Sequence, residues 1–442
     1  MLDYLRLDNV GPAPSMELEL AQRLNLLTGD NGLGKSFLLD CAWWALTQQW
    51  PQELNDNLTS GYRAMPRDRT KPARIGFRVQ SKTKPVTYTS TYSAKDEHWV
   101  GKKGRPVNPG LVIYAHADGG FAVWDPARNY WKKHPGKGVE RVVPAYVFTA
   151  HQVWWGRTIQ TGSVTPTGFG GFRERQLSRG LVDDWAIWIR EKSPIAGAME
   201  GLLELLSAPD ERIIVAPKPQ KLDLDDTRLV PALRMAYGAT VPIVHASAGM
   251  RRIMALAYML LWSYDEHVTA AESLGEKPTR QVTMIFDEIE AHLHPRWQRT
   301  ILGSVLNVAK HLHQKASVQL ITATHSPLVL ASAEPFFDPD QDAWFDLDLN
   351  KQSHIVEIRR RPFVAHGDAS RWLTSEAFDL EEARSRPAEE AIREAKGFAR
   401  RKDRSLEAAK AIDAKLRAAG LPDIDPFWVR WGYMMDELKG RT

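Results

Sequence analysis

The sequence feature that most constrains the fold is an eight-residue segment, Gly29-Asp30-Asn31-Gly32-Leu33-Gly34-Lys35-Ser36. It fits the P-loop pattern of Gly, four residues, then Gly-Lys-Ser. The glycines let backbone N–H groups turn toward a phosphate without a Cβ clash, the lysine places a charge on the β- and γ-phosphates, and the serine hydroxyl can ligate Mg²⁺. The residues expected to hold the nucleotide are Gly29, Asn31, Gly32, Gly34, Lys35, Ser36 and Phe37.

The flanking residues support this interpretation. Residues 23–28 predict a short buried strand before the loop, and residues 37–50 have helical periodicity that Pro51 stops. The nucleotide would therefore lie at a helix N-terminus. The alternative is a glycine-rich turn that matches by chance, and the strand–loop–helix order argues against it.

Composition indicates a globular protein. The 442 residues are 43% hydrophobic and 25% charged, and they allow two or three folding units or one large domain with insertions. The single cysteine, Cys41, excludes an internal disulfide and fits a reducing compartment. The 58 basic and 54 acidic residues nearly balance, so charge gives little support for nucleic-acid contact.

No targeting or membrane segment is visible. The first seven residues alternate in character and do not resemble a signal peptide. The longest apolar run, Ile253 to Trp262, is too short to span a bilayer. We expect a cytoplasmic protein without a membrane partner.

Alternating segments predict β-structure around the loop. Residues 2–8 and 15–20 form a predicted hairpin, and an antiparallel sheet region is predicted from residues 73–79, 86–92, 111–115 and 121–124. Basic residues cluster between and after these strands, either as solvated loops or as a phosphate-contacting patch: Lys102, Lys103, Arg105, Lys132, Lys133, Lys137 and Arg141.

The character of the sequence changes after residue 149. Residues 181–190 and 195–206 have helical spacing, which predicts an inserted helical lobe. Trp154 and Trp155 could stack on a base, but tryptophans are spread along the chain, so core or interface packing is the favoured interpretation.

Two further strands are predicted to end in chemically active residues. The apolar run 281–286 is followed by Asp287 and Glu288, which is the Walker B arrangement at the ligand-binding end of a buried strand. Asp287 would hold Mg²⁺, and Glu288 would orient or deprotonate the attacking water. After a predicted helix over 295–312, the strand 318–324 ends at His325, which is placed to sense the γ-phosphate.

In this order the P-loop, the Ser-x-Gly at 247–249 before an apolar helix, the Walker B pair and the strand-terminal histidine resemble an ABC-type ATPase head. The motifs are similar to those of the group with structural-maintenance-of-chromosomes (SMC) proteins, RecF-type recombination mediators and overcoming-lysogenisation-type ATPases. The resemblance implies an α/β fold: an ABC-type P-loop NTPase head with a parallel-sheet core and antiparallel β lobe, an inserted helical lobe and a helical C-terminal tail. The expected boundaries are 1–149 and 241–362 for the two parts of the head, 150–240 for the insertion and 363–442 for the tail.

The resemblance also implies roles in a dimer that sandwiches ATP. Ser247 and Gly249 would cap the γ-phosphate of the partner head, and His325 would be the switch histidine. Lys35, Glu288 and His325 are the expected catalytic residues. The expected Mg²⁺ contacts are Ser36, Asp287 and Gln152, with a surface glutamine as the alternative for Gln152. A zinc site at His292 and His294, or at His311 and His313, is disfavoured because no further ligands accompany them.

Some features depart from the family pattern. The signature reads Ser-Ala-Gly-Met-Arg, which leaves the roles of Arg251 and Arg252 open. No long heptad stretch follows the P-loop, which argues against a cohesin-like tether. In the tail, residues 381–401 and 405–419 predict helices without a recognisable nuclease motif, so no catalysis beyond ATP hydrolysis is expected. The tail either docks a partner or packs on its own head.

The expected function is an ATP-binding and ATP-hydrolysing protein that dimerises on ATP with Mg²⁺. Compact relatives with this layout, similar to the ATPases of Septu and retron defence systems, favour gating of a separate nuclease or toxin effector in anti-phage defence. The alternative is a DNA repair or recombination ATPase that binds DNA directly. A transporter subunit is disfavoured by the atypical signature, the β-rich first lobe and the helical tail. A homodimer is expected, an oligomer beyond it is left open, and DNA is a candidate partner.

Overall fold

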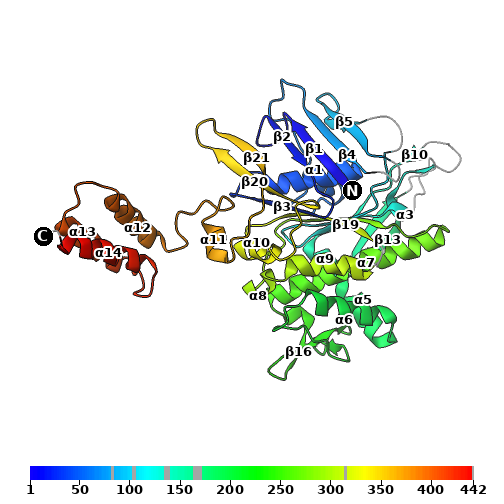
Figure 1. Ribbon diagram of the computed structural model, residues 1–442. Coiled ribbons are helices and arrows are strands. Elements are labelled where there is room, and N and C mark those ends of the chain that lie inside the picture. Colours follow the sequence, from blue (N-terminus) through cyan, green and yellow to red (C-terminus); the bar gives the residue numbers. More distant parts are fainter. Residues whose placement is uncertain (81–83, 102–105, 134–139, 163–171, 313–315, 441–442) are drawn as a thin grey trace. The chain divides into compact units, whose positions relative to one another are not determined.

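The computed structural model describes residues 1–80, 84–101, 106–133, 140–162, 172–312 and 316–440 (Figure 1). The chain divides into two compact units, Met1–Ala365 and His366–Thr442, and each is described by itself. Among the described residues, no helix has the length and apolar character needed to cross a membrane.

An eight-stranded sheet forms the centre of the first unit, in the order β11-β8-β7-β18-β19-β3-β20-β21. Its five central strands are parallel: β7 (Leu111–Ala115), β18 (Gln281–Phe286), β19 (Ser317–Ala323), β3 (Leu24–Gly29) and β20 (Asp342–Asn350). Antiparallel strands complete the edges: β8 (Phe121–Trp124), β11 (Tyr146–Phe148) and β21 (Ile355–Arg361). The central strands β7, β18 and β19 are buried at most positions because both faces of the sheet are covered.

A second sheet is antiparallel and has the order β2-β1-β4-β5-β6. Its strands are β1 (Leu2–Asp8), β2 (Ser15–Glu19), β4 (Arg74–Val79), β5 (Val86–Ser93) and β6 (His98–Val100). In β2 exposed and buried residues alternate strictly, as expected for a sheet with one wet face. The predicted hairpin of residues 2–8 and 15–20 is confirmed.

Helix α1 (Lys35–Thr47) contacts strands of both sheets, which explains why ten of its 13 residues are buried. Figure 1 shows it beneath the antiparallel sheet. The helix ends at Gln48 in a left-handed conformation with φ 60°, earlier than residue 50. Pro51 starts the short helix α2 (Pro51–Leu54) and does not stop α1, because a proline is tolerated in a first helical turn.

The other face of the main sheet is covered by helices. α7 (Ala248–Ser273) contacts β7, and α9 (Ile301–Leu312) contacts β19. Two further helices, α5 (Leu181–Glu191) and α6 (Pro194–Leu206), form the next layer, with α6 against α7 and α9 (Figure 1). The predicted single helix over 295–312 is wrong: α8 (Pro295–Gln298) ends before α9 begins. The remaining short helices of this unit are α3 (Pro126–Asn129), α4 (Ala150–Trp155), the 3₁₀ turn η1 (Ile243–His245) and α10 (Pro327–Ala333).

Two expectations about strands are corrected. Residues 111–115 and 121–124 belong to the main sheet, because β7 is buried at every position and pairs in parallel with β18. The segment 150–240 contains strands beside its helices. Its pairs are β12 (Arg157–Gly162) with β13 (Phe172–Ser178), β14 (Gln220–Lys221) with β15 (Leu229–Val230), and β16 (Ala232–Arg234) with β17 (Thr240–Pro242). A further pair joins β9 (Lys132–Lys133) to β10 (Glu140–Arg141).

The second unit is helical, as predicted for the tail. Its helices are α11 (Ala369–Leu373), α12 (Arg386–Ala399), α13 (Leu406–Ala418) and α14 (Phe427–Gly440). The last three share one apolar cluster that includes Ile392, Phe398, Leu416 and Trp431. Helices α12, α13 and α14 therefore pack on one another around a core of their own.

Candidate active site

The loop between β3 and α1 has the backbone that its glycines permit. Gly29, Gly32 and Gly34 all have positive φ, at 129°, 79° and 97°. A Cβ at Gly29 would lie 2.1 Å from the Leu347 carbonyl oxygen, and one at Gly34 would lie 2.8 Å from Pro12 Cγ, whereas one at Gly32 would meet nothing within 4 Å. Two glycines thus allow close packing behind the loop, and the open side at Gly32 fits a phosphate cradle at the start of α1.

The ammonium group of Lys35 is bound to carbonyl oxygens of this loop. Its side chain is buried, and its Nζ donates hydrogen bonds to the carbonyl oxygens of Gly29 at 2.7 Å and Asp30 at 2.9 Å. Burial lowers the pKa of Lys35, and the Asp287 carboxylate opposes that shift. The ammonium group therefore lies between the loop and the Walker B acids, where it can meet phosphate oxygens.

Asp287 follows the last residue of β18. Its carboxylate is 6% exposed, and Oδ1 has no hydrogen-bond partner among the described residues. Burial raises the pKa of Asp287 to about 6, and a hydrogen bond with Ser36 opposes the shift. Ser36 and Asp287 are thus neighbours. One carboxylate and one hydroxyl fit Mg²⁺, which takes few protein ligands and completes its shell with phosphate oxygens and water.

Glu288 has an unusual backbone for its residue type. Its φ is 50°, in the left-handed region that non-glycine residues seldom adopt. The side chain is half-buried, and its charge acts on Lys35, Arg252 and His325. Strained residues of this kind concentrate where a side chain has to be aimed for function.

His325 is positioned through Glu290. Glu290 accepts hydrogen bonds from the Thr324 hydroxyl at 2.7 Å and from the His325 backbone N–H at 2.6 Å. Burial lowers the pKa of His325, and the charge on Lys35 lowers it further. Sequence reasoning gave Glu290 no role of its own, and its place two residues after Glu288 was the only available signal. The structure brings the Walker B segment and the histidine into one hydrogen-bonded unit.

The sheet order adds His116, which the sequence analysis missed. It follows β7, the strand beside β18, and the Asp287 N–H donates to the Ala115 carbonyl at 2.9 Å. His116 is fully buried, its Nδ1 lies 3.1 Å from Ser60 Oγ, and its Nε2 has no partner among the described residues. The Arg252 Nη2 donates to the His116 carbonyl oxygen at 2.9 Å. The residue that follows the strand next to Walker B is therefore polar. It is a histidine, whereas the expected Mg²⁺ contact was a glutamine.

Gln152 has a different place from the one expected. It is the third residue of α4, where it forms a capping box with Thr149. Its Oε1 accepts hydrogen bonds from the Thr149 N–H at 3.0 Å and from Asn55 Nδ2 at 2.7 Å. Both lone pairs of this oxygen are engaged in these hydrogen bonds, and a Mg²⁺ contact of Gln152 stays a prediction.

The signature residues lie at the start of α7. Ser247 caps this helix by accepting from the Met250 N–H at 3.3 Å, and its side chain is exposed. A Cβ at Gly249 would lie 3.1 Å from the His292 carbonyl oxygen and 3.6 Å from the Trp297 ring. The signature turn thus packs against the segment that follows Walker B in the same head.

The remaining sequence-predicted residues have simpler roles. Asn31 is exposed in the loop, and the ring of Phe37 packs against the turn at Gly11. Within the described ranges, no three His, Cys, Asp or Glu side chains are grouped to hold a metal ion, and His294 caps α8. His313 and the side chain of His311 lie outside the described part of the chain.

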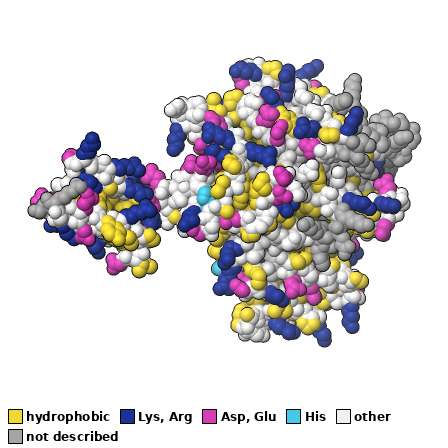
Figure 2. All heavy atoms as spheres, in the orientation of Figure 1, with side chains coloured by type: hydrophobic (Ala, Val, Ile, Leu, Met, Phe, Trp, Pro, Cys, Tyr) yellow, Lys and Arg dark blue, Asp and Glu magenta, His cyan; other side chains and the backbone are white. Residues whose placement is uncertain are grey.

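The proposed basic patch can be followed only in part. Lys102, Lys103, Arg105 and Lys137 lie outside the described residues, as do the side chains of Lys133 and Arg141. On the face seen in Figure 2, basic and acidic side chains are interspersed.

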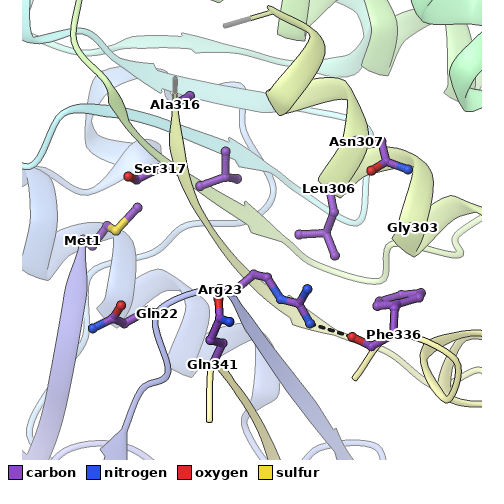
Figure 3. A pocket seen from close by; sticks show the side chains of 11 residues that line it. Met1, Gln22, Arg23, Gly303, Leu306, Asn307, Ala316, Ser317, Phe336 and Gln341 are labelled. Carbon is purple, nitrogen blue, oxygen red and sulfur yellow. Dashed lines mark hydrogen bonds between the residues drawn. The ribbon is translucent and has the colours of Figure 1, made fainter. Parts of the chain in front are cut away.

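A cavity of about 490 Å³ lies where strands β3 and β19 of the main sheet begin (Figure 3). The P-loop follows the other end of β3. Arg23, just before β3, and Ser317, at the start of β19, line it, and the Arg23 guanidinium donates to the Phe336 carbonyl oxygen at 2.6 Å. Ligands of parallel sheets bind at the carboxyl ends of strands. This cavity is at the amino ends, so we do not assign the nucleotide to it.

The fold and the site define a class of protein. The P-loop strand lies between β19 and β20, the Walker B strand lies between β7 and β19, and the signature residues begin α7. This arrangement is that of a P-loop α/β ATPase fold, as the sequence motifs predicted.

Family models match two parts of the chain. One, described as "AAA domain, putative AbiEii toxin, Type IV TA system", matches residues 172–331, and another, described as "AAA domain", matches residues 4–108. The retron Vc95 probable ATPase of Vibrio cholerae serotype O1 biovar El Tor is 30% identical over 115 residues. That match covers 25% of this chain and only 21% of the retron protein. Part of the chain thus resembles a retron ATPase.

Solved structures of SMC and RecF proteins are also similar. The SMC head domain from Thermotoga maritima has a TM-score of 0.39 and 13% identity, and the match covers 82% of this chain and 99% of that one. A structure of the recombination mediator protein RecF has a TM-score of 0.35 and 12% identity. The match covers 81% of this chain and 98% of the RecF chain.

The raised pKa of Asp287 predicts a pH-dependent effect of Asp287→Asn on stability. Because burial raises this pKa from 3.8 to about 6, the native protein holds a proton that the unfolded chain has released in that interval. The free energy of unfolding therefore falls as pH rises through it. Without nucleotide and with a chelator present, Asp287→Asn should melt at a higher temperature than wild type at about pH 7.5, and the difference should shrink near pH 5.

Thermal unfolding of both proteins across this pH range measures the effect. Asp210→Asn, at an exposed carboxylate, is the matched control and should show no such pH-dependent difference. A lower melting temperature for Asp287→Asn at pH 7.5 would show that the hydrogen bond with Ser36 outweighs the cost of burying the charge.

Proposed function

We propose that this chain binds and hydrolyses ATP with Mg²⁺, dimerises around ATP through two heads, and gates a separate effector in bacterial anti-phage defence. The observation that carries the proposal is the convergence of Lys35, Asp287 and His325 at the carboxyl ends of three neighbouring parallel strands. Chemistry at a γ-phosphate depends mainly on positioning and charge neutralisation, and these residues supply both.

Each residue has a role in the proposed reaction. Lys35 exchanges its bonds with the loop carbonyls for phosphate oxygens, and Ser36 and Asp287 hold Mg²⁺, which neutralises charge on the β- and γ-phosphates. Glu288 orients the attacking water and accepts its proton. His325, with its ring favoured in the neutral form, donates a hydrogen bond to the γ-phosphate.

The proposed dimer is supported by the exposure of the signature residues. Ser247 and the start of α7 are exposed in this single head, so they are free to reach the γ-phosphate bound by a second one. ATP held between two P-loops and two signatures would favour the closed dimer, and hydrolysis would release it. An equilibrium between two states of this kind can bias an attached effector through differential binding.

The defence role is proposed from partial resemblance. The partial match to the retron ATPase and the family description that names a toxin–antitoxin system both support it. In this proposal the effector is a separate nuclease or toxin, and the cell compartment is the cytoplasm. DNA repair with direct DNA binding is the alternative outcome of the test below.

The test measures ATP turnover and solution mass of the purified protein, with and without DNA. We expect Mg²⁺-dependent turnover and an ATP-dependent doubling of mass, neither altered by DNA. Turnover stimulated by DNA, with binding that weakens steeply as salt rises, would favour repair. A protein that stays monomeric and inactive under all these conditions would contradict the proposed hydrolysis and dimerisation.

A further inference from the structure

A second cavity, of about 510 Å³, lies beside the start of α7. Its walls come from α4, from the first turns of α7 and from the segment after β18. The chemically distinctive side chains in the lining are His151, Trp154, Trp155, Arg251, Arg252 and His292. No P-loop residue lines it, so it is distinct from the phosphate site described above.

The two tryptophans are not core residues. The sequence favoured core or interface packing for them, but both are only half-buried and both line the cavity. The Arg228 guanidinium lies 4.9 Å from the centre of the Trp155 ring, and His151 is next to the same ring. Trp154 makes no ring or cation–π contact with a described residue, and it lines the cavity.

The polar part of the lining is basic. Arg251 is exposed, and Arg252 has a buried Nη1 without a hydrogen-bond partner among the described residues. His151 and His292 are exposed at the cavity, and no Asp or Glu contributes to its lining. The carboxylates of Asp118, Asp287 and Glu288 offset part of the charge on Arg252, so Arg251 is the main cation available to a ligand.

A half-buried tryptophan and an exposed arginine in one cavity suit a ligand with a planar ring and a phosphate. Bases stack on aromatic side chains whatever their identity, and arginine pairs with phosphate through two parallel hydrogen bonds. The cavity volume falls in the range of small-ligand sites. We propose that this cavity binds one nucleotide unit, with its base on Trp154 and its phosphate on Arg251. The unit is either a free mononucleotide or the end of a single strand.

The experiment first weakens P-loop binding and then measures the second site. In a Lys35→Ala background, thymidine monophosphate and a short oligo(dT) are titrated by calorimetry. Trp154→Ala and Arg251→Gln, each added to this background, should weaken the binding seen there at least tenfold. The matched controls are Trp428→Ala and Arg430→Gln, which change a half-buried tryptophan and an exposed arginine of the C-terminal unit and should leave binding unchanged.

The outcomes separate the two sources of the ligand. If both probes bind and the cavity variants weaken the binding of both, the site takes free nucleotides. If only oligo(dT) binds, the site takes strand ends. The proposal is overturned if neither probe binds, or if binding persists in both cavity variants. Should Trp154→Ala fail to fold, Arg251→Gln decides, because an exposed arginine leaves the core intact. Because Trp154 and Arg251 are not P-loop residues and the P-loop is weakened in every protein compared, failure here is independent of the proposed ATP hydrolysis.

Discussion

Replacing Glu288 with glutamine is expected to lower ATP turnover about 10²- to 10⁴-fold, the usual contribution of a general base. Glutamine has nearly the same shape as glutamate but cannot accept a proton from water. Lys35, Ser36 and Asp287 are untouched, so ATP and Mg²⁺ should still bind. With ATP bound and not consumed, the closed dimer should accumulate.

The measurement is ATP turnover beside solution mass, for wild type and Glu288→Gln, with ATP and without nucleotide. Glu272→Gln, at an exposed position near the end of α7, is the matched control and should match wild type in both readouts. Unchanged turnover in Glu288→Gln would place the base elsewhere. Lost turnover without an ATP-dependent dimer would separate hydrolysis from dimerisation and remove the support for gating by dimer release.

Replacing Lys35 with alanine is expected to weaken ATP binding by roughly 10- to 150-fold, since a hydrogen bond to a charged group contributes about 1.5–3 kcal/mol. The rise in melting temperature that ATP gives the wild-type protein should disappear at the same ATP concentration. The nucleotide-free protein should be less affected. The variant loses two hydrogen bonds to loop carbonyls but no longer buries a charged ammonium group.

Thermal unfolding with increasing ATP, at fixed Mg²⁺, checks this prediction. Lys410→Ala changes an exposed lysine of α13 and serves as the matched control, with an ATP-dependent shift equal to that of wild type. If Lys35→Ala retains the full shift, ATP binds away from the P-loop.

Local motifs made the phosphate site predictable from the sequence. The P-loop lies between a buried strand and a helix, and both of these have short-range signals: an apolar run before Gly29 and helical periodicity after Lys35. Asp287 and Glu288 follow a second apolar run, and His325 follows a third. Carboxyl ends of parallel strands meet at one edge, so the convergence of these residues could be expected without knowledge of the strand order.

The residues that surround the site could not be predicted without the strand order of the sheet. His116 is next to Walker B only because β7 pairs with β18, and the two strands are more than 160 residues apart. Residues 111–115 are apolar at every position, which fits a strand buried on both faces but does not show which strands it pairs with. The place of Gln152 also depends on the strand order, since it follows β11, which is an edge strand of the sheet.

In the inserted segment, residues 150–240, the prediction from sequence was limited by the length of the elements. Its helices α5 and α6 were predicted because their apolar periodicity spans three or more turns. Its short strands carry no such signal: β14 and β15 have two residues each, too few for an alternating pattern. Such strands are stabilised by tertiary packing, which the local sequence does not report.

The separate core of the C-terminal unit has a consequence for how this protein can diversify. Phe398, Leu416 and Trp431 are buried against one another within 366–442, and the P-loop, Walker B and signature residues all lie before residue 366. Substitutions that remodel the outer surface of α12–α14 therefore leave the residues of the ATP site unchanged. A gene lineage could exchange this unit for another while retaining the P-loop, Walker B and signature residues.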